Sequence, residues 1–182
     1  MHKTIYKLIL PLLTLFIFTG CTVGTNENVQ HVRAYELRAV DDYSIDGIKR
    51  IRWFIDAPDA ISREQRAYTA QEAAKDCKKK TSAQECTIIQ VATQNAFSYG
   101  DLFYAVLVLD KNDQSKAEVS SVLLSRQDYN IGYYYIKLRT TYKDAEPQEF
   151  QKAFYHVMIN KLKIPENELK LPKIQREEFI IK

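Results

Sequence analysis

The chain has 182 residues, of which 46% are hydrophobic and 27% are charged, and its formal net charge is +3. Lys3 and Lys7 are the only Asp, Glu, Lys or Arg residues among the first 20, so the 26 basic residues fall to 24 in the rest of the chain, against 23 acidic ones. A nearly neutral chain lacks the basic footprint of a nucleic-acid-binding protein, and we expect no nucleic-acid partner.

The first 20 residues have the organisation of a secretory signal peptide. His2, Lys3 and Lys7 form a short basic start, and an apolar run over residues 8–18 follows. A membrane-spanning helix needs about 20 apolar residues, whereas this run is shorter and is interrupted by Pro11. The pattern therefore predicts a signal peptide over residues 1–20 that is removed on export.

Phe18-Thr19-Gly20-Cys21 resembles the lipobox of bacterial lipoproteins. Gly20 and Cys21 match that motif, while Phe18 and Thr19 depart from its commonest residues. The resemblance implies that Cys21 receives a diacylglycerol and, after cleavage, becomes a new N-terminus carrying fatty acyl chains such as palmitate. An ordinary secreted protein with an incidental Cys21 is the alternative.

Lipidation at Cys21 predicts a protein tethered to a membrane, because two or three acyl chains anchor stably where one does not. Residues 21–31 are then the lipidated cysteine and a flexible polar tether. Thr22 stands where an Asp often marks retention in the inner membrane. We therefore expect an outer-membrane lipoprotein that faces the periplasm of the cell envelope.

The next segments predict a hairpin and a helix. Residues 32–45 and 48–55 alternate as two strands, and Asp46-Gly47 between them is a turn signal. Ser62 and Gln65 have the spacing of a capping box, which predicts a helix over residues 63–79. Its inner stripe consists of small side chains that allow close approach to a sheet: Ala67, Ala70, Ala73, Ala74 and Cys77.

Cys77 and Cys86 remain as a pair once Cys21 is lipidated. An exported chain reaches an oxidising compartment, where a disulfide persists. We predict a Cys77–Cys86 bridge between the end of the helix and the start of the next strand, with two free thiols as the alternative. Their spacing does not suit a zinc site.

The second half predicts four strands, at residues 86–93, 102–109, 119–125 and 131–142. Residues 102–109 are almost wholly apolar, which indicates a central strand covered on both faces. Pro147 opens a second helix, and residues 179–181 are a candidate edge strand. The order ββαββββα indicates an α+β fold, with a mainly antiparallel sheet of five to six strands and two packed helices in one domain over residues 32–182.

Three short motifs support this fold: Tyr35-Glu36-Leu37, Asp42-Tyr43-Ser44 and Lys49-Arg50, followed by a helix and an alternating strand. Together they resemble an uncharacterised bacterial family, a domain of unknown function, over roughly residues 35–109. The resemblance implies a fold and carries no activity.

Motifs for catalysis, metals and cofactors are not apparent. His31 and His156 lie far apart, and only three glycines fall within the domain, which excludes a glycine-rich phosphate loop and a G-x-S-x-G elbow. Residues 42–47 partly mimic a calcium loop, but Trp53 occupies the position of its bidentate Glu, so a hairpin turn is favoured. We expect no catalytic residue, metal or cofactor, although a carboxylate pair that meets only in space stays open.

The tyrosine-rich segment offers a candidate binding surface. On a strand over residues 131–142, Tyr133, Tyr135, Lys137 and Arg139 share one face. Tyr and Arg are enriched at binding hot spots, although cross-strand tyrosine packing on a solvated sheet face explains the same pattern without a partner.

These observations favour a non-catalytic envelope lipoprotein that binds another protein or cell-wall material. An immunity, exclusion or inhibitor lipoprotein that blocks a toxin or hydrolase is a second function that fits. An envelope enzyme that acts through carboxylates is a third, and it requires a deep pocket holding two acids with displaced pKa values.

Overall fold

A computed structural model describes residues 31–97 and 99–181. The predicted signal peptide, the lipobox with Cys21 and nearly all of the tether lie outside the described residues. None of the helices in the described part is long and apolar enough to cross a membrane.

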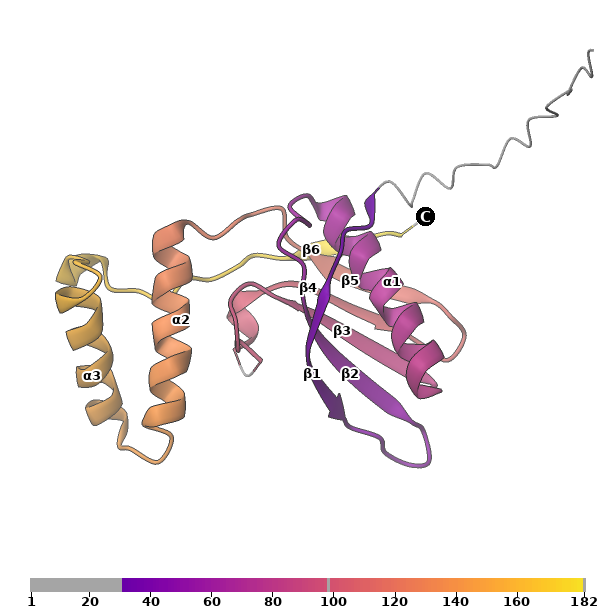
Figure 1. The fold of residues 1–182 in the computed structure, drawn as a ribbon, viewed down its shortest axis with the longest axis horizontal. Helices are drawn as coiled ribbons and strands as arrows, with labels where there is room; N and C mark the ends of the chain where they lie inside the picture. The colour runs from indigo at the N-terminus through magenta and orange to yellow at the C-terminus, as the bar shows by residue number, and fades with distance from the viewer. Residues whose placement is uncertain (1–30, 98, 182) are drawn as a thin grey trace, which may run out of the picture.

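One six-stranded sheet organises the chain, and its strands lie in sequence order (Figure 1). They are β1 (Glu36–Asp42), β2 (Arg50–Asp56), β3 (Glu85–Val91), β4 (Phe103–Leu109), β5 (Ser115–Val119) and β6 (Glu177–Phe179). β2 and β3 run parallel, and all other neighbours are antiparallel. The predicted α+β class with a mainly antiparallel sheet is confirmed.

Helix α1 (Arg63–Thr81) connects the two parallel strands and packs on one face of the sheet. The predicted capping box is confirmed, because the Ser62 hydroxyl accepts from the Gln65 amide at 3.2 Å while the Gln65 side chain accepts from the Ser62 amide at 3.1 Å. Its alanine stripe is fully buried against the sheet. Small side chains thus bring the helix close to the strands, as the sequence predicts.

The turn between β1 and β2 is also as predicted. Asp46 and Gly47 have φ values of 53° and 73°, and Ile45 and Ile48 pair on either side of them. Two consecutive residues with positive φ define the tight hairpin turn for which Asp-Gly is favoured.

The prediction of two strands after β4 is wrong. The strand expected at residues 119–125 does not form there: β5 lies earlier, over Ser115–Val119, and residues 120–125 form a linker. The strand expected at residues 131–142 is helix α2 (Arg126–Thr141), which the Ser125 hydroxyl caps by accepting from the Asp128 amide at 3.0 Å.

Tertiary packing explains why a segment rich in tyrosine and threonine is helical. Ile131, Tyr134, Tyr135, Leu138 and Tyr142 recur at helical spacing and pack against helix α3 (Pro147–Asn160). This shared apolar seam outweighs the β propensity of tyrosine and threonine, which is a weak and context-dependent preference.

The helix opened by Pro147 is confirmed as α3, so the described residues form three long helices where two were expected. Figure 1 shows α2 and α3 as a pair beside the sheet, and we refer to them as the helical hairpin. Two short 3-10 turns, at Gly100–Leu102 and Glu166–Glu168, complete the elements, and the chain returns to the sheet as the edge strand β6, two residues earlier than predicted.

Strand β4 is central, but only one of its faces is fully covered. Phe103, Ala105, Leu107 and Leu109 are buried, whereas the alternate side chains are half-buried. The prediction of a strand covered on both faces is therefore wrong. The face opposite α1 is covered in part by the β3–β4 loop, with Phe54, Ile89, Val91, Leu102 and Ile136 in one cluster.

Candidate functional site

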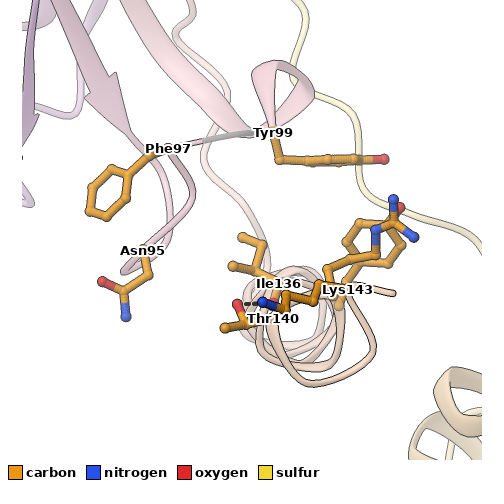
Figure 2. A pocket seen from close by; sticks show the side chains of 8 residues that line it. Asn95, Phe97, Tyr99, Ile136, Thr140 and Lys143 are labelled. Carbon is orange, nitrogen blue, oxygen red and sulfur yellow. Dashed lines mark hydrogen bonds between the residues drawn. The ribbon is translucent and has the colours of Figure 1, made fainter. Parts of the chain in front are cut away.

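A cleft lies where helix α2 meets the loop that joins β3 to β4 (Figure 2). Its main cavity has a volume of about 640 Å³ and is lined by Asn95, Phe97, Tyr99, Tyr135, Ile136, Arg139, Thr140 and Lys143. A smaller depression of about 300 Å³ shares three of these residues and adds Gln94, Tyr133, Lys137 and Thr141. The two hollows adjoin along α2, and we call them together the α2 cleft.

The four side chains of the predicted binding surface all line this cleft, although not as a strand face. On a helix, Tyr133 and Lys137 form one pair four residues apart, and Tyr135 and Arg139 form another. The first pair lines the smaller depression and the second pair lines the main cavity. The prediction that the four side chains share a single strand face is therefore wrong. The structure does bring all four to one cleft, and their role in binding stays a prediction.

The loop wall of the cleft was not foreseen from the sequence. Asn95 has a φ of 63°, a left-handed conformation that Asn tolerates better than most residues. Phe97 packs edge-on against Phe54 of β2, with ring centroids 5.2 Å apart. No periodicity marks such loop residues in advance, because their place depends on the strands that carry them.

Tyr135 forms a rigid aromatic wall. Its ring packs edge-on against Phe150 and Phe154 of α3, at centroid distances of 5.2 Å and 5.4 Å, and tilts against Tyr99 at 4.9 Å. Burial and the neighbouring Tyr135 and Asp101 raise the pKa of Tyr99. The Tyr99 hydroxyl is therefore neutral at neutral pH.

Three cations line the cleft, and none of its described lining residues is a carboxylate. The Arg139 guanidinium lies 4.9 Å from the centre of the Phe150 ring. Within the described part of the chain, neither Arg139 nor Lys137 forms an ion pair. Lys143 pairs with Asp144 at 3.8 Å, but both side chains are largely exposed, and such pairs contribute little.

Gly132 allows α2 to approach the loop closely. A Cβ at this position would lie 2.9 Å from Cδ1 of Leu102, which is fully buried. Glycine inside a helix costs about 0.5–1 kcal/mol relative to alanine. The close contact with Leu102 gives a physical reason for a glycine at this point of the helix.

Arg66 fixes the linker that leads from the sheet to the helical hairpin. This fully buried guanidinium donates to the carbonyls of Ala60, Ser120 and Val122, at 2.7 Å for Ala60 and 3.1 Å for Val122, and lies 3.9 Å from the Tyr104 ring centre. Burial lowers the pKa of Arg66 to about 10, so the group is still charged at neutral pH.

Arg176 fixes the linker that returns from the helical hairpin. It donates to the carbonyls of Gly100 and Phe103, both at 2.9 Å, and the Ile174 amide donates to the Asp101 carbonyl at 2.9 Å. Because both linkers are held on the sheet, the cleft between the helical hairpin and the β3–β4 loop is preformed.

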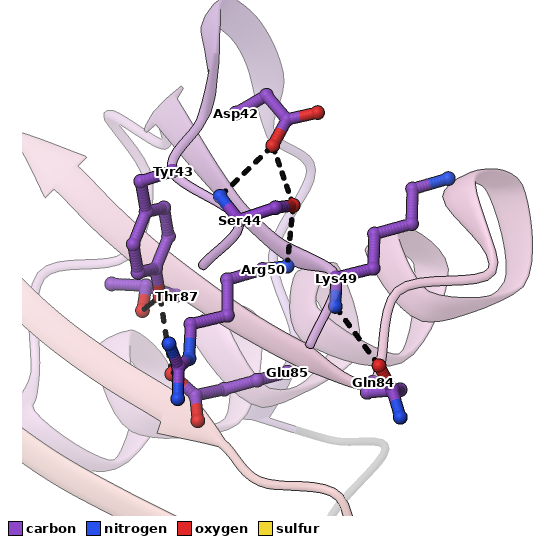
Figure 3. A network of polar contacts seen from close by, with 8 residues as sticks. All are labelled: Asp42, Tyr43, Ser44, Lys49, Arg50, Gln84, Glu85 and Thr87. Carbon is purple, nitrogen blue, oxygen red and sulfur yellow. Dashed lines mark hydrogen bonds and ion pairs between the residues drawn. The ribbon is translucent and has the colours of Figure 1, made fainter. Parts of the chain in front are cut away.

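Two of the three family-like motifs, Asp42-Tyr43-Ser44 and Lys49-Arg50, lie elsewhere, in a polar network at the β1–β2 hairpin (Figure 3). Asp42 accepts from the Ser44 amide and hydroxyl at 3.0 Å and 2.6 Å, which lowers the pKa of Asp42, and the Ser44 hydroxyl accepts from the Arg50 amide at 3.0 Å. The Tyr43 hydroxyl lies 2.7 Å from that of Thr87 on β3.

Ion pairing and a second amide contact complete this network. The Arg50 side chain lies 3.6 Å from the Glu85 carboxylate, and the Lys49 amide donates to the Gln84 side chain at 2.9 Å. The polar and charged groups in these contacts pair with one another across β1, β2 and β3. The motif residues therefore secure the hairpin to the sheet.

Cys77 and Cys86 are both fully buried, and the structure contains them as free thiols. The predicted disulfide is therefore not found. The neighbouring Cys77 thiol, together with burial, nevertheless raises the pKa of Cys86. The proximity predicted between the helix end and the strand start is present.

Within the described part of the chain, no three His, Cys, Asp or Glu side chains gather closely enough to hold a metal ion. His31, expected in the solvated tether, instead stacks on Tyr68 of α1 at 5.6 Å. His156 is exposed on α3, next to Asn160.

Comparison with known proteins gives one family match. Residues 30–107 match the model of a domain of unknown function (DUF4875). This segment is similar to an uncharacterised domain family. The resemblance predicted from the three motifs is confirmed at that level, and the matched segment ends within β4, before the helical hairpin.

A solved structure shares the fold over a longer range. The crystal structure of a DUF487 family protein from Desulfovibrio piger ATCC 29098 has a TM-score of 0.61 and 18% sequence identity, covering 82% of this chain and 96% of that one. Such coverage extends beyond residues 30–107. None of the curated proteins matches the chain.

Proposed function

We propose that this chain is an envelope lipoprotein, tethered to the membrane through Cys21, and that its domain is a non-catalytic module that binds a partner protein in the α2 cleft. The observation that carries the proposal is a preformed cavity of about 640 Å³ with a fixed aromatic wall. The tether and the location in the outer membrane rest on residues 1–22 of the sequence.

Physical properties of the cleft suit binding. Tyrosine and arginine provide large contact areas and hydrogen bonds, and they predominate at binding hot spots. Tyr135 is already held by Phe150, Phe154 and Tyr99. A side chain that is ordered before binding loses little conformational entropy when a partner docks, which favours affinity.

The lining also favours binding over catalysis. None of its described residues is His, Cys, Asp or Glu, the side chains that most often supply nucleophiles and general acids or bases. The amide of Asn95 and the hydroxyl of Thr140 provide polar contacts without obvious activation.

A photo-crosslinking residue in place of Thr140, in the full lipidated chain in living cells, tests this proposal. Thr140 is exposed and lines both hollows. Lys152, exposed on α3 outside the cleft, is the matched control position. We expect one discrete adduct with an identifiable protein at residue 140, none at residue 152, and loss of the adduct in a Tyr135→Ala/Arg139→Ala variant. Equal adducts at both positions, or no adduct at residue 140, would contradict a binding role for the cleft.

A further inference from the structure

The arginines of the chain differ in how their charge is compensated. Those on the strands lie against carboxylates: Arg38 with Asp56 at 2.8 Å, Arg50 with Glu85 at 3.6 Å, and Arg52 with Asp41 at 3.2 Å. Arg139 has an aromatic ring as its neighbour and no carboxylate among the described residues. Its guanidinium donors are therefore available to a ligand.

A guanidinium is well matched to a carboxylate, because its planar fork donates two parallel hydrogen bonds to the two oxygens. Lys137 and Lys143 lie on either side of Arg139 in sequence and line the same cleft. This cationic lining is complementary in charge to an anionic ligand whose negative charges are spread along its length.

The aromatic groups of the cleft indicate which anionic ligand fits. Sugars are bound by stacking on free ring faces, whereas the Tyr135 ring is enclosed by Phe150, Phe154 and Tyr99. The side-chain amides of Gln94 and Asn95 also line the cleft. Amide groups pair with the donors and acceptors of a peptide backbone.

We infer that the α2 cleft takes an acidic peptide segment of its partner, with Arg139 as the residue that binds a carboxylate and Lys137 and Lys143 extending the cationic track. This inference rests on the proposed function, since it names the chemistry of the partner in the same cleft. A glycan is the competing occupant, which the experiment includes as an outcome, and no catalytic step is assigned.

The test uses fluorescence anisotropy with the full lipidated chain in detergent. The probes are short labelled peptides in which Glu and Leu alternate, matched peptides in which Gln replaces Glu, and, as competitor, an unlabelled oligosaccharide of N-acetylglucosamine, which carries no carboxylate and no peptide. The protein variants are Arg139→Gln, Arg139→Lys, and Arg126→Gln as the control. Arg126 lies exposed on α2 outside the cleft, so its replacement removes an equal charge from the same helix.

We expect the Glu peptide to bind, and the Gln peptide to bind at least about tenfold more weakly, since a charge-assisted hydrogen bond of 1.5–3 kcal/mol corresponds to tenfold or more in Kd. Arg139→Gln weakens the Glu peptide by a similar factor, Arg139→Lys weakens it less, and Arg126→Gln leaves Kd unchanged.

Three results would overturn the inference: equal binding of the Glu and Gln peptides, equal Kd values for the native chain and Arg139→Gln, or no binding of any peptide. Displacement of the Glu peptide by the oligosaccharide would also contradict the inference and would assign the cleft to a glycan. Each of these leaves the crosslink at residue 140 intact if the cleft is still a binding site, so failure of the inference is distinguishable from failure of the proposed function.

Discussion

The sheet with α1 and the helical hairpin differ in how often their cations are paired with carboxylates. On the strands, cations pair with carboxylates of neighbouring strands, as Arg52 does with Asp41. On the helical hairpin, cations lie over aromatic rings, as Arg139 does over Phe150 and Lys161 over Tyr134 at 4.8 Å. An arrangement that satisfies its own charges stabilises a fold, whereas one that leaves cations without carboxylates is suited to a partner.

The family match ends before the helical hairpin begins. It covers residues 30–107, which contain the polar network of β1 to β3 and most of β4. The helical hairpin, which carries all four residues of the predicted binding surface and the α2 wall of the cleft, lies after that segment. The loop wall of the cleft, with Asn95, Phe97 and Tyr99, lies within the matched segment, so the cleft combines residues from inside and outside the match.

The largest effect is expected where the two regions join. Arg66→Met removes donors to the carbonyls of Ala60, Ser120 and Val122 and leaves them buried, which should lower the free energy of unfolding by about 3 kcal/mol or more. Urea denaturation measures this, and limited proteolysis in the 120–125 linker should become faster.

Arg126→Met is the matched control for that change, because Arg126 is exposed and outside the joint. If Arg66→Met unfolds at the same urea concentration as the native chain, Arg66 does not hold the linker, and the cleft is not preformed by this contact.

A moderate effect is expected within the sheet region. The Tyr35 hydroxyl donates to the Asp76 carboxylate at 2.7 Å, and burial together with this bond raises the pKa of Tyr35. A raised pKa in the folded state means that this stabilisation is complete below the unfolded pKa of about 10 and is lost as the pH rises above it.

Tyr35→Phe should therefore lower the free energy of unfolding by about 1 kcal/mol at neutral pH. Above about pH 10, the free energy of unfolding should fall less steeply with pH in the variant than in the native chain. Denaturation curves across that pH range provide the measurement. An unaltered pH dependence in the variant would show that Tyr35 does not titrate with unfolding, while binding of the acidic peptide should be the same in both chains.

The smallest effect on stability is expected for Gly132→Ala, although it should alter binding. Replacing glycine by alanine in a helix is favourable by up to about 1 kcal/mol, but here the added Cβ meets Leu102 at 2.9 Å, and the two effects oppose each other. We expect little change in the urea midpoint and a weaker Kd for the Glu peptide, because α2 moves from the loop. A clear rise in stability with unchanged Kd would show that the contact does not set the width of the cleft.

Sequence patterns predicted the elements whose signals are local. The capping box at Ser62 and Gln65, the Asp46-Gly47 turn and the alternation of Ile51, Trp53 and Ile55 each determine their own structure with few distant contacts. From these features the sheet, helix α1 and the α+β class could be predicted.

Helix α2 was missed because its signal depends on a partner. Its apolar seam gains meaning only when α3 lies opposite, and taken alone its tyrosines and threonines favour a strand. The cleft was half predicted for the same reason: the α2 side chains were selected by residue type, whereas Asn95, Phe97 and Tyr99 reach it through a loop whose course depends on β3 and β4.

The pairing of β5 with β6 has a consequence for how this architecture can change. Val119, the last residue of β5, is the register partner of Glu177, the first residue of β6. The chain leaves the sheet and re-enters it at adjacent points, so the intervening segment behaves as a cassette. A different excursion, or a short turn, can be inserted there without shifting the register of any strand.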